Sequence, residues 1–506
     1  MASTAIKTEE EKREYFDDPE TLDSKVTQLA EWVRESQNMS VFTGAGISTS
    51  TGIPDYRSGY GTVLETGPGC WEKAAKKQQY KEDMKKAGKQ LPAAHRIPFN
   101  MTIQQAKPSP THMALVELQN RGILKGVVSQ NIDGLHRKSG IKADMMAELH
   151  GNTNLELCIK CDREHMRDYK TSAGNKSHKT GRICDTPGCG GELKDTIINF
   201  GESLNAEILM RGFALHGVSD LAIAMGSSMR VQPACMMPLG CIANGGRFVM
   251  INLQKTQVDA AAHLVIHERV DKVICLLMQK LEIPIPEWRR SYRMKVFLSQ
   301  DKNQVKFTGV DANGACYTLF KNIKVSGVSP AAAQFPQRGQ VQPYAHNITK
   351  QNVNEFSVQC TFQGHYSEPV LTFKVPMETL RATGAMEFEM VYHVASGVFE
   401  KVVMHNSETR DVLGEATFSA AAAPAAQGNR GGSPPAPQAR GAAAARPAAA
   451  ARQPAASAAN RNKSVAASSA KRVGNNGRGP AAAAGKVNGA AVIPKNRPAM
   501  AASAAL

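Results

Sequence analysis

Three polar side chains of reactive type follow a short apolar run. The run, residues 126–129, is expected to be a buried strand, and Asn131, Asp133 and His136 come directly after it. In open α/β sheets, ligands bind in the crevice beyond the carboxyl ends of the strands. An amide, a carboxylate and an imidazole at that place indicate chemistry. For this segment alone, a polar loop that closes a strand remains the alternative.

A glycine-rich turn indicates a phosphate site. Gly44, Ala45 and Gly46 follow a strand expected over 39–42 and are expected to open a helix. Glycine lets the backbone approach a pyrophosphate, and N–H groups at a helix N-terminus point toward it. The turn lacks the third glycine of the complete dinucleotide fingerprint, so it needs support from other segments.

That support comes first from the loop after the turn. Asp55, Tyr56 and Arg57 place an acid, an aromatic ring and a cation where they could fold over a charged cofactor. A surface ion pair between Asp55 and Arg57 is the alternative interpretation.

A lone histidine, His150, lies beside Gly151 and is the strong general-base candidate near the polar strand end. A lone histidine is more often structural. An imidazole titrates close to neutral pH, however, and is suited to removing a proton from a hydroxyl group.

Two short cysteine pairs predict a metal site. Cys158-x2-Cys161 and Cys184-x4-Cys189 are separated by 22 residues. Two such pairs bind one tetrahedral Zn²⁺ between two knuckles, and four thiolates leave no open position, so a structural zinc is predicted. The ten cysteines of the chain are therefore expected to be thiols and metal ligands, with no disulfide framework.

Two more strand ends carry small polar residues. Gly226-Ser227-Ser228 ends a strand expected over 221–225, and Asn252-Leu253-Gln254 ends one expected over 248–251. Hydroxyl and amide groups there are suited to hydrogen bonds with ribose and adenine, although each segment alone could be an ordinary turn.

These groups need an α/β framework to position them. Helical periodicity over 22–37, 111–121 and 270–281 alternates with the four apolar strands. That alternation predicts a Rossmann-like parallel sheet covered by helices on both faces. The Lys-rich segment 71–91 is expected to be a solvated helix, with a binding patch as the alternative.

The C-terminal part of the chain has a different pattern of apolar and polar residues. Residues 294–418 contain runs of period two, which predict antiparallel strands and a small β-sandwich. The tail lacks aromatic residues and is expected to be disordered. The expected organisation is an N-terminal extension over 1–20, an α/β domain over 21–290 with the cysteine module at about 152–194, a β-rich domain over 294–418, and the tail over 419–506.

The positive charge of the chain belongs to this tail. It carries 12 Lys and Arg and no acid, which leaves +4 of the formal +16 for residues 1–418. Contact with DNA or chromatin through phosphate neutralisation is the expected role, and a flexible spacer is the alternative. No secretory signal is apparent, and no apolar run approaches the ~20 residues that span a bilayer, so no membrane partner is expected.

Together these segments resemble the sirtuins, the NAD-dependent protein-lysine deacylases. GAGIS, IPDYR, SQNIDGLH, ELHGN, the four cysteines, FGESL, GSS and INLQ occur in family order over about residues 20–290. Segments beginning at Pro108, Gly190 and Leu281 resemble the chromatin-associated class IV branch. That branch usually has a Trp shortly after the Asp-aromatic-Arg loop, where this chain has Val63, and the basic insertion at 71–91 is longer than expected.

The resemblance implies roles for individual residues. Asn131 and Asp133 would order the nicotinamide ribose and a water, and His150 would be the general base. The four cysteines would bind zinc. The loops at 200–202 and 229–231 would hold the substrate backbone as an added strand. The NAD site would be lined by Ala45, Thr49, Tyr56, Arg57, Gln130, Gly226, Ser228, Asn252, Gln254 and Val270.

The resemblance also implies the reaction: acyl transfer from a protein lysine to ADP-ribose with release of nicotinamide. Acyl-lysine proteins, histones among them, would be the substrates, in the nucleus or otherwise in the cytoplasm. Two other functions stay open at this point, a mono-ADP-ribosyltransferase and a non-catalytic sensor of NAD or ADP-ribose.

Overall fold

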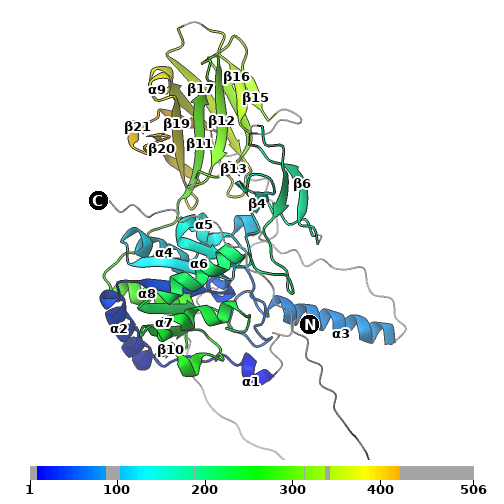
Figure 1. Cartoon of the computed structure of the whole chain (residues 1–506), viewed down its shortest axis with the longest axis vertical. Helices are drawn as coiled ribbons and strands as arrows, with labels where there is room; N and C mark the ends of the chain where they lie inside the picture. Colours follow the sequence, from blue (N-terminus) through cyan, green and yellow to red (C-terminus); the bar gives the residue numbers. More distant parts are fainter. Residues whose placement is uncertain are drawn as a thin grey trace, which may run out of the picture. The chain divides into compact units, whose positions relative to one another are not determined.

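A six-stranded parallel sheet forms the centre of the N-terminal half of the molecule (Figure 1). The computed structural model describes residues 8–86, 103–336 except 175, 187 and 313, 342–350 and 352–421. The strand order, β3-β2-β1-β8-β9-β10, is the 3-2-1-4-5-6 order of a doubly wound Rossmann-like fold, as predicted. The strands are β1 (Met39–Thr43), β2 (Leu124–Ser129), β3 (Met146–Glu148), β8 (Leu221–Met225), β9 (Arg247–Ile251) and β10 (Leu264–Ile266).

Helices cover both faces of this sheet. On one face α2 (Pro19–Glu35), α4 (Pro110–Asn120) and α8 (Val270–Lys280) share an apolar core with the strands. The other face is covered by α6 (Ala206–Gly217), η5 (Ala234–Leu239) and α7 (Gly240–Ala243). The three predicted helices are confirmed.

Helix α2 begins earlier than its apolar period indicates. Asp18 caps its N-terminus by accepting from the N–H groups of Glu20 and Thr21, and Pro19 occupies the first turn. A proline there loses no helical hydrogen bond, so it marks the start of the helix.

The glycine turn after β1 opens a helix as predicted, but this helix is a short 3₁₀ turn and not an α-helix. The glycine turn continues into two single 3₁₀ turns, η1 (Ala45–Ile47) and η2 (Thr49–Thr51). Hydroxyl groups in this run hydrogen-bond backbone carbonyls: Thr49 Oγ1 donates to Gly46 and Thr51 Oγ1 to Ser48. Gly52 then takes the left-handed conformation at φ 87°. Local side-chain bonds of this kind compete with helix formation.

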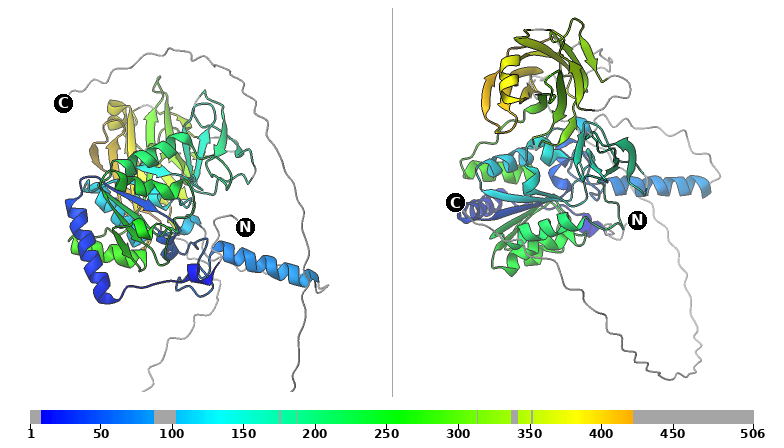
Figure 2. Two further views of the ribbon diagram at one scale, coloured as in Figure 1. Left: turned by 60° about the horizontal axis from the view of Figure 1, so that its bottom comes forward. Right: turned by 45° about the horizontal axis from the view of Figure 1, so that its top comes forward.

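The Lys-rich segment forms a solvated helix, α3 (Cys70–Lys86), in which no residue is buried. Both views of Figure 2 show α3 projecting from the α/β core. Residues 87–91 of the predicted segment lie outside the described residues. The other short helices of the described chain are α1 (Glu9–Lys12), α5 (Leu135–Ser139), α9 (Met377–Thr383), η3 (Ile103–Gln105), η4 (Ala143–Met145) and η6 (Asp259–Ala261).

An eleven-stranded sheet unites the cysteine module with part of the C-terminal region. Its order is β21-β20-β19-β11-β12-β13-β5-β4-β7-β6, with β16 paired to β12. The junction is a parallel pairing in which Cys316, Tyr317 and Thr318 of β13 lie opposite His165, Met166 and Arg167 of β5. The strands are β4 (Leu155–Cys158), β5 (Glu164–Arg167), β6 (Lys179–Ile183), β7 (Glu192–Asp195), β11 (Arg290–Leu298), β12 (Gln304–Val310), β13 (Cys316–Thr318), β16 (Tyr344–Asn347), β19 (Ala385–His393), β20 (Val398–Asn406) and β21 (Val412–Glu415).

A five-stranded sheet, in the order β15-β14-β17-β18-β22, shares an apolar core with strands β11, β12 and β19 of the larger sheet. Along β19 the side chains alternate between buried and half-buried, which confirms the predicted period of two. The C-terminal region is therefore built of two sheets with one core between them. The strands are β14 (Phe320–Ser326), β15 (Ala333–Phe335), β17 (Glu355–Phe362), β18 (Leu371–Pro376) and β22 (Phe418–Ala420).

Two further expectations concern the membrane and the tail. Within the described residues, no helix is both long and apolar enough to cross a membrane. The prediction that the tail is disordered from residue 419 is wrong for its first three residues, because Ser419 and Ala420 belong to β22 and the N–H of Ala421 donates to Val370 at 3.0 Å. From residue 422 onward the tail lies outside the described residues.

Candidate active site

A cavity of about 870 Å³ opens at the carboxyl ends of the central strands. It lies where the strand order reverses, between the end of β1 at Gly44 and the end of β8 at Gly226. This switch point is where doubly wound sheets bind their ligands, and the volume falls within the usual range of about 300–1,000 Å³. Every predicted cofactor residue lines the cavity: Gly44, Ala45, Gly46, Thr49, Asp55, Tyr56, Arg57, Gln130, Gly226, Ser227, Ser228, Asn252, Leu253, Gln254 and Val270.

The two glycine turns at the switch point are in direct backbone contact. The N–H of Gly44 donates to Met225 at 3.1 Å, and that of Gly46 donates to Gly226 at 2.8 Å. A Cβ on Gly46 would lie 2.6 Å from the Cα of Gly226. Glycine is required at this position because the two chains touch there, and their contact forms the floor of the cavity.

His150 follows β3 and lines the cavity wall. Its Nδ1 lies 2.9 Å from the carbonyl oxygen of Gln130, which can only accept, so Nδ1 carries the hydrogen. Nε2 is left with a lone pair. Burial lowers the pKa of His150, while the hydrogen bond to Gln130 opposes that shift. The structure thus holds a neutral imidazole in one tautomer beside the cavity.

The three polar side chains after β2 lie in different surroundings. Asn131 lines the cavity, and its Nδ2 donates to the carbonyl oxygen of Gly44 at 3.0 Å. Asp133 is buried and is absent from the cavity wall, because its carboxylate accepts from Ser48 Oγ at 2.7 Å and from the N–H of Leu135 at 2.9 Å. Asp133 therefore supports Ser48 from behind the site.

His136 is a core residue, so the expectation that all three side chains reach the crevice is wrong for it, as it is for Asp133. It is 3% exposed, and its Nε2 lies 2.9 Å from Thr43 Oγ1. Burial lowers its pKa to about 3, so the ring is neutral. Gly134, two residues before His136, has a left-handed conformation and caps the N-terminus of α5. In this helix the His136 ring points toward α4, where it contacts the ring of His112.

The Arg57 guanidinium gives this end of the cavity a preference for an anion. Burial lowers the pKa of Arg57 to about 10, and the charge of Arg230 contributes to the same shift. Asp55 stays close, accepting from the backbone N–H groups of Arg57 and Ser58 at 3.1 and 3.0 Å. A bound anion such as a pyrophosphate would favour the charged form of Arg57, which burial and the neighbouring cation disfavour.

The two segments expected to hold the substrate reach the cavity to different extents. Phe200, Gly201 and Glu202 all line it. Of the second segment, 229–231, only Val231 does so; Met229 is buried, and Arg230 is paired with Glu11 at 2.7 Å.

Sequence reasoning missed several residues of this wall. Ser48 lies behind the cavity wall, where its hydroxyl group links Asp133 to Asn131. The position of Ser48 in the GAGIS motif was the sequence feature that could have identified it. Trp71 also lines the cavity, although it lies in the Lys-rich segment, for which a solvated helix was predicted and a binding patch was the alternative. Glu14, Arg269, Asp271 and Lys272 had no sequence signal that linked them to the site.

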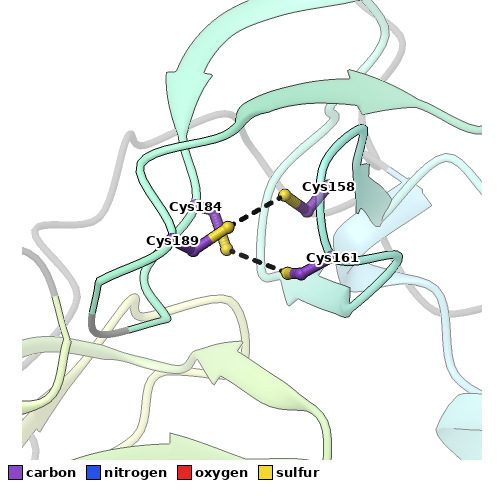
Figure 3. Close-up of side chains that lie close together, drawn as sticks. All are labelled: Cys158, Cys161, Cys184 and Cys189. Atoms are coloured by element: carbon purple, nitrogen blue, oxygen red, sulfur yellow. Dashed lines mark hydrogen bonds between the residues drawn. The ribbon is translucent and has the colours of Figure 1, made fainter.

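The four predicted metal ligands form one cluster, drawn in Figure 3. Cys158 Sγ lies 3.6 Å from Cys189 Sγ, and Cys161 Sγ lies 3.7 Å from Cys184 Sγ. A tetrahedron with Zn–S bonds of about 2.3 Å has sulfur–sulfur edges of about 3.8 Å, so the cluster fits a zinc ion. Backbone N–H groups of Lys160 and Thr186 point at two of the sulfurs, as they do around thiolates. None of the four cysteines lines the cavity.

Comparison with known proteins gives consistent results. The model of the Sir2 family matches residues 44–233. NAD-dependent protein deacetylase SRT1 of Arabidopsis thaliana is 40% identical over 289 residues, which are 57% of this chain and 55% of the relative. NAD-dependent protein deacetylase Sirt6 of Drosophila melanogaster is 35% identical over 54% of this chain and 81% of its own length.

This chain thus spans about half the length of the Arabidopsis relative. A solved structure described as "Sir2-p53 peptide-NAD+" is 29% identical and matches 51% of this chain and 98% of its own, with a TM-score of 0.36.

Proposed function

The chain belongs to the Sir2 family, and from its site we propose that it is an NAD-dependent protein-lysine deacylase. The observation that carries this proposal is the pairing of a neutral, tautomer-fixed His150 with the glycine turn Gly44–Gly46 on one cavity wall. A protein that only binds a dinucleotide needs the turn but has no use for an oriented base. Relatives named NAD-dependent protein deacetylases support the same reaction.

NAD would supply a ribose whose C1′ accepts the acyl oxygen as nicotinamide leaves, so that the acyl group ends on ADP-ribose. The N–H of Ala45, between the two glycines whose N–H groups are already engaged, and the cationic Arg57 would bind the pyrophosphate. The Ser227, Ser228 and Asn252 side chains at the ends of β8 and β9 would hold the adenosine half. Holding the reactants in the correct relative orientation can lower the activation free energy by about 7–11 kcal/mol.

His150 would be the general base, because Nε2 has a lone pair and Nδ1 is held by the carbonyl oxygen of Gln130. Asn131 would orient the nicotinamide ribose and a water, since its amide is fixed by Gly44. Asp133 would act on the site by fixing Ser48, which in turn lies 3.5 Å from Asn131 Nδ2.

We assign Zn²⁺ to the four-cysteine cluster and give it a structural role. Four thiolates complete a tetrahedral ion, so no position is left for a substrate or an activated water. None of these four cysteines lines the cavity, and no step of the reaction is routed through the metal.

The class IV branch is the proposed place of the chain within the family, with acyl-lysine proteins of the nucleus, including histones, as substrates. The class IV-like segments at 108–115 and 281–288 support the branch. Similarity to a protein named Sirt6 is consistent with it.

Substitution of His150 by Tyr tests the function. Purified protein is incubated with NAD and acetyl-, succinyl- and myristoyl-lysine peptides, and the products are read by mass. The wild type should convert at least one peptide to free lysine and release nicotinamide. The variant should lose about 100-fold or more of the rate, the scale of a missing general base, while it stays folded and keeps its zinc.

The same assay separates the alternatives. Gain of ADP-ribose on the peptide, without loss of the acyl group, would favour a mono-ADP-ribosyltransferase. No nicotinamide release with any acyl peptide, together with tight ADP-ribose binding, would favour a sensor. Near-normal deacylation by the His150→Tyr variant would contradict the base assignment.

A second proposal concerns the basic tail, residues 419–506, and DNA. Its 12 cations and lack of acids support phosphate binding with counterion release. Deletion of residues 422–506, which removes all 12 cations and spares β22, should flatten the salt dependence of DNA binding, measured by fluorescence anisotropy at several salt concentrations. Peptide deacylation should be unchanged, and unchanged DNA affinity would leave the tail as a spacer.

A further inference from the structure

The turn that carries His150 is closed by a hydrogen bond between two side chains. Asn152 Nδ2 donates to Glu148 Oε1 at 2.8 Å, so the residues two positions before and two positions after the histidine are joined to each other. Glu148 ends β3, Asn152 is fully buried, and neither lines the cavity. The bond therefore restrains the backbone on both sides of the base without entering the site.

The backbone of this turn is packed tightly against the segment after β7. Gly151 has a left-handed φ of 81°, and a Cβ there would lie 1.8 Å from the carbonyl oxygen of Thr196. The hydroxyl group of Thr196 also accepts from the N–H of Asn152 at 3.1 Å. Because the imidazole of His150 is oriented through one ring nitrogen, by Gln130, its position depends on where this turn holds the backbone.

A buried guanidinium supplies the opposite charge for Glu148. Arg137, on α5, has its Nε 3.0 Å from Glu148 Oε2, and both side chains are 9% exposed. The N–H of this Nε is not aligned with an acceptor, so attraction between opposite charges holds the contact. Burial raises the pKa of Glu148, and the charge of Arg137 opposes that rise. Since an unpaired carboxylate is costly to bury, Glu148 depends on Arg137 to remain charged in this place.

The same guanidinium is also bound to the cysteine module. Nη1 and Nη2 of Arg137 donate to the two carboxylate oxygens of Glu164 at 2.7 and 3.1 Å. Glu164 is the first residue of β5, which pairs with β4 of the same module. A bidentate pair of this kind fixes the plane of the guanidinium as well as its distance. The module therefore orients Arg137, and Arg137 faces Glu148 from that fixed orientation.

We propose that Arg137 is a positioning residue for the general base, His150. Held by Glu164, the guanidinium anchors the buried Glu148, and Glu148 together with Asn152 fixes the turn on which the base lies. This inference rests on the proposed function, in which His150 is the base. It adds that the cysteine module contributes to the rate through geometry, since a displacement of about 1 Å in a reacting group can cost about 100-fold in rate.

Two carboxylates on one guanidinium provide a matched pair of variants. Glu148→Gln and Glu164→Gln each remove one negative charge beside Arg137 and preserve the size of the side chain. Kinetics of the full-length, zinc-loaded protein with NAD and an acyl peptide give kcat and both KM values. Glu148→Gln should lower kcat about tenfold or more by displacing the base, with both KM values unchanged because Glu148 does not line the cavity.

Glu164→Gln is the control and should leave kcat unchanged. Its amide oxygen can still accept from the guanidinium, whereas the contact of Arg137 with Glu148 depends on charge. Thermal melting curves are recorded for both variants. A lowered melting temperature with unchanged kcat in Glu148→Gln would mean that the network is merely structural, which would overturn the inference.

A second measurement does not depend on turnover. NMR titration of the imidazole protons in the full-length protein gives the pKa of His150, whose signal is identified by its absence from the His150→Tyr variant. In Glu148→Gln a loosened turn exposes the ring to water, so the pKa should rise from its lowered value toward 6.5. Loss of the negative charge by itself would lower this pKa, so the sign separates the two causes. A pKa that falls or stays the same would overturn the inference.

A double variant tests whether Arg137 acts through Glu148. Arg137→Gln is made in the Glu148→Gln background, where the carboxylate that it would leave unpaired and deeply buried is already absent. If Arg137 acts through Glu148, kcat should fall no further than in Glu148→Gln alone. A further fall would show that Arg137 acts by another route and would contradict the inference.

Failure of the proposed function gives a different result. A wild type that frees no lysine from any acyl peptide would contradict the function and, with it, the role of Arg137. A wild type that deacylates the peptide, but whose Glu148→Gln variant keeps both kcat and the pKa of His150, would contradict the positioning role alone.

Discussion

At the scale of single residues, the site depends on which polar groups are committed to partners and which remain available. The Asp133 carboxylate accepts from Ser48 and Leu135, and His136 Nε2 is engaged by Thr43, while His136 Nδ1 is buried without a partner. His150 has only Nδ1 engaged, by Gln130. Residue type therefore suggested three reactive groups after β2, whereas the hydrogen bonds leave Asn131 at the cavity wall and assign the base to His150.

The pKa of His150 predicts the pH dependence of the reaction. A general base must be neutral, and burial lowers its pKa from the ordinary value of 6.5. The rate should therefore be constant near neutral pH and fall only as the pH drops through this lowered pKa. Measurement of kcat/KM from pH 5 to 8.5, with a peptide that has no group titrating in that range, should place the acid limb below 6.5. An acid limb above 6.5 would point to a different base.

At the scale of elements, the cavity floor is a contact between two turns. The turn after β1 and the turn after β8 touch through glycine, and the absence of side chains there leaves room for a pyrophosphate. The helix that usually follows such a turn is replaced by η1 and η2. Because the N–H groups of Gly44 and Gly46 already donate to Met225 and Gly226, phosphate recognition would depend on the N–H of Ala45 and on Arg57 rather than on the dipole of a long helix.

Substitution of Gly46 by Ala tests this contact. The new Cβ would lie 2.6 Å from the Cα of Gly226 and would force the two turns apart. We expect a loss of about 1–3 kcal/mol of stability from overpacking and a marked loss of NAD affinity.

Gly61→Ala is the matched control, because a Cβ at Gly61 meets nothing within 4 Å and its φ is not left-handed. Thermal unfolding and calorimetric titration with NAD should separate the two variants. Equal NAD affinity in both would show that the glycine contact does not shape the site.

At the scale of the whole molecule, the zinc module and the C-terminal sheets are one structure. Parallel pairing of β5 with β13 continues one sheet from the cysteine cluster into the C-terminal region. Arg167 adds three side-chain contacts at this junction, to Glu156 at 2.6 Å, to Asp185 at 3.1 Å and to Thr318 at 2.7 Å. Asp185 directly follows the ligand Cys184, so the metal and the junction share a segment.

Zinc removal should therefore destabilise backbone structure outside the cysteine module, in strand β13. In the Cys161→Ser variant, or after chelation, amide hydrogen exchange should rise by about tenfold or more in β13, because local opening of β5 removes its hydrogen-bond partner. Strand β8, which pairs only within the parallel sheet, is the internal control and should not change. Metal content is measured in parallel. Unchanged exchange in β13 after zinc loss would mean that the junction is independent of the metal.

The sequence alone determined the parallel sheet, the period-two strands of the C-terminal region, the four clustered cysteines and the predicted cofactor residues of the cavity wall. Most of these features were predictable because they depend on short-range periodicity, on local spacing and on the rule that strand ends meet at one edge. Other cavity residues, such as Thr49 and Val270, were predicted only from the resemblance to the family. The tertiary structure decided that Asp133 and His136 turn inward, that Trp71 reaches the cavity, and that β5 pairs with β13. Each of these depends on partners distant in the chain, such as Arg167 and Thr318, which are 151 residues apart. No local pattern encodes such contacts, because their energy exists only once the chain has folded.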